Sequence, residues 1–393
     1  MIQQRLRVLL IEDNPGDAHM VKTVLKEVKT PGFIVMHEST LTEAIERLKV
    51  SAAFDVLLLD LGLPDSHSSE TLGRLQEAIT PLPIVIMTGN DDPLAAEHAI
   101  EAGAQDYVIK GELDGRSLSR TLLYAIYRFR SDKERLALAE MLAVEYDRMA
   151  EELSTARNMQ FHLLPSVARL DRIRSTYGLS VDGFFKPSSD IGGDLWGCLE
   201  GEDGRLVVYA LDFSGHGVGA ALNVFRLHTL ISELKEQIAN PAATLQQLNS
   251  TLRELLPRGQ YATIVLAVID TVAGTMTWSG AGAPRPILFD PSGNTQWVDT
   301  SGPPLGLQAS AKYFNRQIAF PPGCCLFIYS DAMTEAVIAD GEMFEDERLL
   351  DLVRRHHTPA GGIGIAAMAA QFLDQVETPL GDDMTAVSIA HIA

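Results

Sequence analysis

Two aspartates lie in a glycine-rich part of the chain, residues 188–219, at positions that could bind a cation. Asp194 follows a glycine pair, and Asp212 ends the apolar run 206–211. An apolar strand that delivers a carboxylate into a glycine-rich loop can present a hard oxygen ligand to a metal ion. Aspartate is also common in turns and at helix N-termini, so this segment alone leaves both interpretations open.

Further aspartates border apolar runs later in the chain. Asp331 follows the run 325–330, and the pair Asp382-Asp383 directly precedes the run 386–390. The ten histidines form no HxxxH pattern, which argues against a zinc hydrolase. A set made only of carboxylates suits Mg²⁺ or Mn²⁺, and a paired site of such ions suits the hydrolysis of phosphate esters.

A second group of chemically able residues lies near the N-terminus, each at the end of a short apolar run. Its members are Glu12, Asp13, Asp60, Thr88 and Lys110. Three carboxylates that are brought together need a divalent cation, while a lysine and a hydroxyl can hold a transferred phosphoryl group. Asp60 is the natural acceptor, because a carboxylate can act as a nucleophile toward phosphorus once a cation neutralises the charge. Each residue alone could be a helix cap or a loop charge, but their ordered positions favour a site.

The elements that position this group alternate between strands and helices over residues 1–128. Such alternation predicts an α/β domain with a doubly wound, five-stranded parallel sheet, in which function collects at the carboxyl ends of the strands. The expected strands are 7–11, 33–38, 55–59, 84–87 and 107–109, and the expected helices are 17–28, 41–50, 69–78, 93–102 and 117–129.

A helical connector is predicted over residues 129–164, because no glycine or proline occurs between positions 117 and 163. Its apolar residues recur with alternating spacings of four and three, which predicts a parallel coiled coil and hence a homodimer. The alternative is a helix that packs on its own domain. The seam residues are Leu142, Tyr146, Met149, Leu153, Ala156, Gln160 and Leu163. Gln160 would mark a weak point or a register choice in that seam.

Residues 165–393 show a different sequence pattern, with short predicted strands, frequent turn signals and helices grouped between the strands. This pattern predicts an α+β domain in which helices flank a sandwich of sheets. The formal net charge of −20 argues against a nucleic-acid surface. No signal peptide and no apolar stretch of about 18 residues is present, so we expect a cytoplasmic protein that does not bind a membrane.

Residues 1–128 resemble a response-regulator receiver domain. The matching segments are LLIEDNPGD, LLLDLGLPD, IVIMTG and GAQDYVIKG. The resemblance implies Asp60 as phosphoacceptor, Glu12 and Asp13 with it as Mg²⁺ ligands, Thr88 as switch hydroxyl and Lys110 as phosphate-pairing base. It also implies Tyr107 as the rotating aromatic, and a histidine kinase or phosphotransfer protein as the upstream partner. Gly111 stands where the family usually has proline.

Residues 156–393 resemble the metal-dependent protein phosphatases of the PPM family, in the SpoIIE/RsbU-like bacterial branch. The matching segments are ARNMQFHLLP, SSDIGGDLWG, LDFSGHGVGAAL, ATIVLAVID, SGAGAPRPILF, PPLGL, FIYSDAMTEA and GDDMTAVSI. The resemblance implies a site for two Mn²⁺ or Mg²⁺ ions. Asp212 would bridge the ions, helped by Asp194 and the Phe213 carbonyl on one side. Asp331 and Asp382 would hold the other ion, and Asp383 is either a further ligand or a hydrogen-bond acceptor at a strand edge.

The two resemblances together imply a phosphatase of phosphoserine and phosphothreonine proteins that is controlled by phosphorylation of Asp60. The substrate usual in the resembling branch is a phosphorylated STAS-type anti-sigma factor antagonist. A water between two cations would attack phosphorus, so no protein nucleophile is needed. A Ser214–His216 triad is rejected because GxSxG is absent, and His216 is expected to structure the loop. The alternatives are a phosphatase-like adaptor that binds a partner without hydrolysis and, on the letters GGD alone, a nucleotide cyclase.

Overall fold

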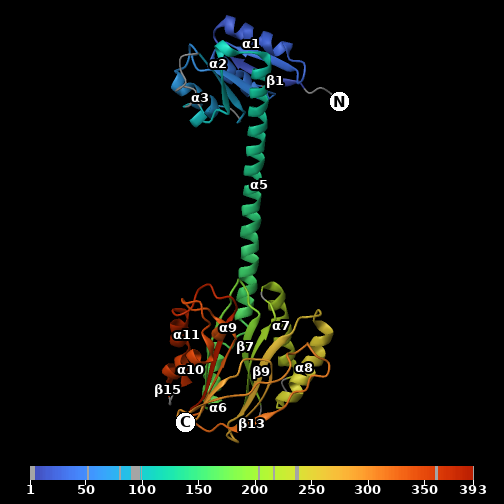
Figure 1. Ribbon diagram of the computed structural model, residues 1–393, viewed down its shortest axis with the longest axis vertical. Helices are drawn as coiled ribbons and strands as arrows, with labels where there is room; N and C mark the ends of the chain where they lie inside the picture. Colours follow the sequence, from blue (N-terminus) through green and yellow to red (C-terminus); the bar gives the residue numbers. More distant parts are fainter. Residues whose placement is uncertain are drawn as a thin grey trace. The chain divides into compact units, whose positions relative to one another are not determined.

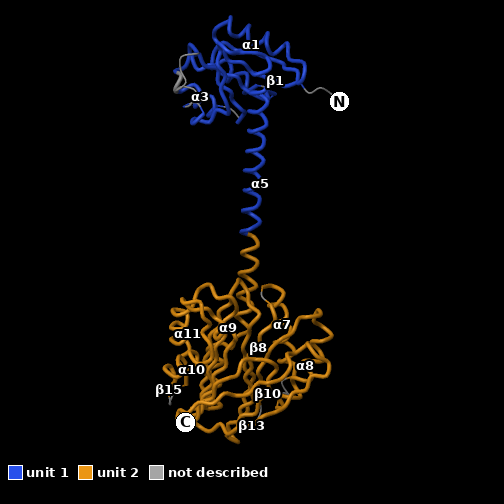
Figure 2. The backbone as a smooth tube through the Cα atoms, viewed as in Figure 1, with its two compact units in different colours: residues 1–147 blue, residues 148–393 orange. Residues whose placement is uncertain are grey.

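The computed structural model describes residues 5–50, 53–78, 81–89, 98, 100–201, 204–215, 217–234, 239–358 and 362–392. The chain divides into two compact units, residues 1–147 and residues 148–393 (Figure 2). Most of the helix predicted at 93–102, and His216, lie outside the described residues. No helix among the described residues is long and apolar enough to span a membrane.

The first unit contains the predicted five-stranded parallel sheet, with the strand order β2-β1-β3-β4-β5. The strands are β1 (Leu6–Ile11), β2 (Phe33–Glu38), β3 (Val56–Asp60), β4 (Ile84–Thr88) and β5 (Asp106–Ile109). The helices are α1 (Pro15–Glu27), α2 (Leu41–Val50), α3 (Ser68–Ala78), the 3₁₀ turn η1 (Lys110–Glu112) and the start of α5 (Gly115–Phe161).

Strand β1 shows why the central strands are apolar throughout. Successive side chains of a strand point to opposite faces of the sheet. Val8 and Leu10 therefore pack under α1 and α5, while Leu9 and Ile11 pack under α2 and α3. Because helices cover both faces, an uninterrupted apolar run is the stable choice for such a strand.

Helix α5 merges the predicted last helix of the first unit with the predicted connector, and it runs over 47 residues. At its start the Asp114 carboxylate accepts the backbone N–H groups of Arg116 and Ser117. In its middle, Leu142 and Tyr146 of the predicted seam are exposed. Gln160 differs from this pattern: its side chain is buried inside the second unit, so the interpretation of Gln160 as a coiled-coil seam residue is wrong.

The second unit is the predicted sandwich of two five-stranded antiparallel sheets between helices. One sheet has the order β13-β10-β9-β8-β7 and the other the order β12-β11-β14-β17-β6. The first contains β7 (Asp194–Glu200), β8 (Arg205–Phe213), β9 (Ala262–Asp270), β10 (Thr275–Ala281) and β13 (Arg316–Ala319). The second contains β6 (Leu179–Lys186), β11 (Ile287–Phe289), β12 (Thr295–Trp297), β14 (Cys325–Tyr329) and β17 (Met384–His391).

The helices of this unit lie on the two outer faces, apart from α6 (Val167–Tyr177), whose buried Ile173 and Tyr177 pack with the core between the sheets (Figure 1). Alternation along β8 shows the layers: Leu206 and Val208 face the core between the sheets, whereas Val207 and Tyr209 pack under helices α7 and α8. The helices are α6 (Val167–Tyr177), α7 (Val218–Glu233), α8 (Pro241–Leu255), α9 (Ala332–Glu335), α10 (Glu345–His356) and α11 (Ile365–Leu373), and a small ribbon joins β15 (His357–Thr358) to β16 (Gly362–Ile363).

Helix α6 and strand β7 were not predicted from the sequence. Helix α6 begins at an N-cap, where the Ser166 hydroxyl accepts the backbone N–H of Arg169, and only its residues Ile173 and Tyr177 are buried. Strand β7 has the sequence DLWGCLE, in which an aspartate and a glycine weaken the strand pattern. Neighbouring strand β8 nevertheless pairs with all seven of its residues.

Candidate functional site

Asp194 and Asp212 face each other across two neighbouring strands. Asp194 is the first residue of β7, and the antiparallel register places it directly opposite Asp212 of β8. Side chains of directly opposed residues point to the same face of a sheet. The pairing therefore holds two carboxylates side by side, although 17 residues separate them in the chain.

The other sheet contributes the second pair of acidic positions. Strands β14 and β17 are antiparallel, with Tyr329 opposite Ala386. The end of β14 and the start of β17 therefore lie at the same end of the sheet. Asp331 comes shortly after β14, and the pair Asp382-Asp383 comes directly before β17. The Ser330 hydroxyl stabilises this edge: it donates to the Asp383 carbonyl at 2.9 Å and accepts the Thr385 N–H at 2.8 Å.

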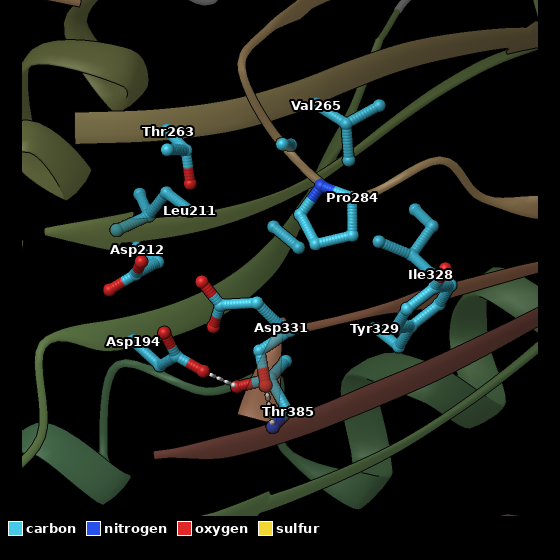
Figure 3. Close-up of a pocket in the computed structure, with 13 residues that line it drawn as sticks. Asp194, Leu211, Asp212, Thr263, Val265, Pro284, Ile328, Tyr329, Asp331 and Thr385 are labelled. Atoms are coloured by element: carbon cyan, nitrogen blue, oxygen red, sulfur yellow. Dashed lines mark hydrogen bonds between the residues drawn. The ribbon is translucent and has the colours of Figure 1, made fainter. Parts of the chain in front are cut away.

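Both sheets meet in one small cleft with about 320 Å³ of empty space (Figure 3). Asp194 and Asp212 of one sheet, and Asp331 and Thr385 of the other, line it. The Thr385 hydroxyl donates a hydrogen bond of 2.7 Å to Asp194 Oδ2, which ties the two sheets together at the cleft. Sequence reasoning placed Thr385 within a matching segment but assigned it no function.

The electrostatics of the cleft indicate carboxylates that lack positive partners. Burial, and then repulsion from Asp212, raises the pKa of Asp194 well above its ordinary value. Burial, and then the charges of Asp331 and Asp382, raises the pKa of Asp212 to about 8. Burial and Asp382 also raise the pKa of Asp331. Among the described residues, no lysine, arginine or histidine forms an ion pair with any of these aspartates.

This donor set fits divalent cations in its chemistry. Clustered carboxylate oxygens are the ligands that Mg²⁺ and Mn²⁺ prefer, and a cation would offset the repulsion that raises the three pKa values. The carboxylates are widely spaced: among the described residues, no three of these aspartates have oxygens that all lie within 4.8 Å of one another.

Asp382 and Asp383 differ sharply in their surroundings. Asp382 is exposed, whereas Asp383 is only 2% exposed. The Asp383 carboxylate accepts hydrogen bonds from the backbone N–H groups of Ser188 and Gly193, and from the Ser188 hydroxyl. Asp383 thus makes the contacts of a hydrogen-bond acceptor that holds the loop before Asp194. The neighbouring backbone is held as well, since Phe213 donates its N–H to the Gly193 carbonyl at 3.0 Å.

The first unit brings together the second predicted group at the carboxyl ends of its strands. Glu12, Asp13 and Asp60 each offer an oxygen within 4.8 Å of the others. The Lys110 ammonium lies 2.7 Å from both Glu12 and Asp60. Burial alone would lower the pKa of Lys110, but its bonds to Asp60 and Glu12 raise that pKa above the ordinary value.

Thr88 of this group and Tyr107, the predicted rotating aromatic, belong to the two neighbouring strands of the sheet. Thr88 is buried at the end of β4, and Tyr107 is an exposed residue of β5. Glu12 is fully buried, so burial raises its pKa while the bond from Lys110 opposes the rise. The arrangement could hold a divalent cation and a phosphoryl group.

Comparisons with known proteins agree with both halves of the chain. The sequence model of the response regulator receiver domain family matches residues 8–120, and that of the stage II sporulation protein E (SpoIIE) family matches residues 202–391. Phosphoserine phosphatase RsbP of Bacillus subtilis is 24% identical over 188 residues, which are 47% of this chain and 45% of that protein. Protein IcfG of Synechocystis sp. is 22% identical over 356 residues, which are 83% of this chain and 53% of that protein.

A solved structure shares the fold of the second unit. The SiaA-PP2C domain of Pseudomonas aeruginosa has a TM-score of 0.54 at 22% identity, and the match covers 63% of this chain and 99% of that one. The chain spans about half the length of RsbP and of IcfG. Residues 8–120 therefore match the receiver-domain family and residues 202–391 match the SpoIIE family, while the second unit shares the fold of the SiaA-PP2C domain.

Proposed function

We propose that this chain is a metal-dependent serine/threonine protein phosphatase whose activity is controlled by phosphorylation of Asp60. The observation that carries the proposal is the cleft in which Asp194, Asp212 and Asp331 converge from two different sheets. Carboxylates with raised pKa values and no cationic partner among the described residues are costly to bury without a function. In the receiver, Asp60 would accept the phosphoryl group, and Lys110, whose ammonium lies 2.7 Å from Asp60, would pair with it.

Two divalent cations would be held by the aspartates of the cleft. Asp194, Asp212 and the Phe213 carbonyl would serve one ion, and Asp331 and Asp382 the other, with Asp212 shared between them. When bound, such ions supply a water that loses its proton near neutral pH, together with positive charge for the phosphoryl oxygens. In the receiver, Glu12, Asp13 and Asp60 would hold Mg²⁺.

The side chains of the chain itself prepare the phosphatase site. Asp212 must lose its proton before it can serve as a ligand, and its pKa of about 8 sets how easily it does so. Thr385 donates to one oxygen of Asp194 and so orients that carboxylate. Asp383 holds the loop in front of Asp194 through two backbone N–H groups.

The substrate proposed is phosphoserine or phosphothreonine on a STAS-type anti-sigma factor antagonist. The proposal of a phosphoserine substrate is supported by the name of the relative RsbP, a phosphoserine phosphatase. A histidine kinase or phosphotransfer protein would phosphorylate Asp60, and two copies of the chain would pair through the exposed part of α5. The alternative is an adaptor that binds the same partner without hydrolysis.

Hydrolysis of a phosphoserine peptide with Mn²⁺ tests the enzyme. We expect activity in the wild type, and loss of at least 100-fold in Asp212→Ala and Asp331→Ala. The matched control is Asp351→Ala, since Asp351 is an exposed aspartate of α10. Full activity in both cleft variants would refute the proposal, and binding of the peptide without any hydrolysis would favour the adaptor.

Control by the receiver needs a separate experiment. Beryllofluoride mimics a phosphorylated aspartate, so its addition with Mg²⁺ should change the hydrolysis rate of the wild type. Asp60→Ala should hydrolyse the peptide and show no response to beryllofluoride. An unchanged wild-type rate would remove the proposed control and leave the phosphatase activity standing.

A further inference from the structure

Arg285 is a cation beside the cleft, in the connection between β10 and β11. The two residues before it, Ala283 and Pro284, line the cleft that Figure 3 shows. The Thr300 hydroxyl fixes this part of the connection, because it donates to the Ala283 carbonyl at 2.7 Å. The Arg285 side chain is 55% exposed, so its guanidinium is open to a ligand from outside the chain.

The register of the second sheet places Arg285 at the same end as the acidic residues of the cleft. Strand β11 begins at Ile287, which pairs with Phe327 of β14. Because antiparallel neighbours run in opposite directions, Arg285, which precedes Ile287, comes level with Tyr329. A shared contact agrees with this position: Asp346 accepts hydrogen bonds from Arg285 Nη2 at 2.9 Å and from the Tyr329 hydroxyl at 3.4 Å. Tyr329 itself lines the cleft.

Two contacts hold the guanidinium in place. Asp346 lies in the first turn of α10, and the Arg285 guanidinium carbon lies 5.2 Å from the centre of the Trp297 ring of β12. A planar guanidinium over an indole ring is attracted to its face and so keeps its orientation. Among the described residues, Asp346 alone accepts a hydrogen bond from Arg285, although a guanidinium has several N–H donors. The other donors are therefore available to a ligand.

The charges at this end of the sheet indicate which ligand needs Arg285. Glu335 of α9 and Asp382 are exposed here, and Asp331 is half-buried between the two sheets. A substrate with carboxylates next to its phosphoserine would be repelled by these groups unless a cation offset them. An arginine binds a carboxylate through two parallel hydrogen bonds, which also fix its direction.

The spacing along the sheet suits a residue near the phosphoserine and not the phosphoserine itself. Arg285 comes level with Tyr329, and Asp331 of the cleft follows Tyr329 by two residues. Two residues of extended chain span about 7 Å, which is also the distance between alternate side chains of an extended peptide. A phosphoserine in the cleft would therefore bring the residue two positions away in the substrate close to Arg285.

We propose that Arg285 is a specificity residue that binds an acidic side chain of the substrate protein, two positions from the phosphoserine. This inference rests on the proposed function, because it takes the cleft as the site of the phosphoserine. It adds a substrate class to that function, namely phosphoproteins with a glutamate or aspartate beside the phosphorylated residue. Exposed ion pairs contribute modestly, so we expect a preference of about 5-fold for such substrates.

The test uses two peptides that bind without being hydrolysed, each with a phosphonate analogue of phosphoserine. The acidic peptide has glutamate two positions before and two positions after the analogue, and the neutral peptide has glutamine at both positions. Fluorescence anisotropy gives the Kd of each peptide for the full-length chain with Mn²⁺. The corresponding phosphoserine peptides give KM and kcat for hydrolysis.

Four variants separate recognition of the substrate from a merely structural tie. Arg285→Gln removes the charge, whereas Asp346→Asn removes the ion pair with α10 and leaves the cation. Arg205→Gln is the matched control, because Arg205 forms a similar exposed ion pair with Asp270 at the end of β8 remote from Asp212. Arg285→Lys keeps a charge without the planar pair of donors, and it replaces Arg285→Gln if that variant does not fold.

We expect the wild type to bind the acidic peptide about 5-fold more tightly than the neutral one. Arg285→Gln should lose this preference and bind the neutral peptide as the wild type does. In hydrolysis, its KM for the acidic peptide should rise while kcat stays the same. Arg285→Lys should keep only part of the preference, and Asp346→Asn and Arg205→Gln should keep all of it.

The outcomes separate this inference from the proposed function. A wild type without the preference, or an unchanged preference in Arg285→Gln, would overturn the inference and leave the phosphatase activity standing. Loss of the preference in both Arg285→Gln and Asp346→Asn would also overturn it, since a structural tie between β11 and α10 behaves in that way. A preference that depends on Arg285, in a wild type that hydrolyses neither phosphoserine peptide, would support the inference and refute the proposed function.

Discussion

Replacement of Thr385 by valine tests whether the hydrogen bond between the two sheets prepares Asp194 for a cation. Valine keeps the branched shape of threonine and removes the hydroxyl that donates to Asp194 Oδ2 at 2.7 Å. Both residues are 2% exposed, so water cannot replace the lost donor. We expect weaker Mn²⁺ binding and lower activity at limiting Mn²⁺, with an almost unchanged fold.

The size of the effect follows from the state of the carboxyl group. A hydrogen bond to a charged group contributes about 1.5–3 kcal/mol, against about 1 kcal/mol for a neutral pair. Burial and the charge of Asp212 raise the pKa of Asp194 and so disfavour its charged form in the metal-free protein, whereas metal binding requires the carboxylate. The variant should therefore lose about 1 kcal/mol of folding stability but bind Mn²⁺ roughly 10-fold more weakly.

The assay is a Mn²⁺ titration followed by calorimetry and by hydrolysis of a phosphoserine peptide. Thr385→Ser is the matched control, because serine restores the hydroxyl without the methyl group. The Ser variant should bind Mn²⁺ nearly as tightly as the wild type. A stability loss of about 1 kcal/mol would lower the unfolding temperature of a domain of this size by roughly 2–4 °C.

Two results would refute this reasoning. Wild-type Mn²⁺ affinity in Thr385→Val would show that the hydroxyl does not orient a ligand. Equal weakening in the Ser and Val variants would assign the effect to packing of the methyl group, and the hydrogen bond would then have no special part in metal binding.

Three further predictions concern the same cleft. The pKa of Asp212 is raised to about 8, so Asp212 binds a proton more tightly in the folded protein than in the unfolded chain. The metal-free protein should therefore lose stability as the pH rises from about 4 to 8, by up to about 1.4 kcal/mol per pH unit. Urea unfolding at several pH values measures this slope, which should be flatter in Asp212→Asn. Gly192→Ala would bring a methyl carbon within 2.6 Å of Asp383 Oδ2 and should cost about 1–3 kcal/mol in thermal unfolding, whereas Gly219→Ala, in open space on α7, should be neutral or stabilising. Asp382→Asn should weaken Mn²⁺ binding with little change in stability, while Asp383→Asn should destabilise the fold; the reverse pattern would make Asp383 the ligand.

Local patterns were sufficient to predict most of the fold. The five strands of the receiver sheet and helix α2 were predicted because apolar runs and helical periods are read over a few neighbouring residues. Strand β7 was missed because its own sequence is a weak strand pattern, and pairing with β8 stabilises it. Helix α6 was missed because it is short and buries only Ile173 and Tyr177, so its apolar residues form no long helical stripe.

The site was predictable only in part, for a related reason. Strand-edge aspartates are visible in the sequence, so Asp194, Asp212 and Asp331 were all named before their convergence in the cleft was known. Thr385 was not named, because its partner Asp194 is 191 residues away and belongs to the other sheet. A hydroxyl becomes informative only when the register of both sheets is known.

The helical period of α5 explains why Gln160 was placed in a coiled-coil seam, and its environment explains what the pattern means. Leu142, Tyr146 and Met149 are more than 60% exposed in the single chain, whereas Gln160 is fully buried. The same heptad pattern therefore covers two kinds of surface. The apolar residues in its first part are exposed and could contact a second copy, whereas Gln160 in the last turn already binds the segment before Asp194. A partner helix can therefore use only the part of the seam before Gln160.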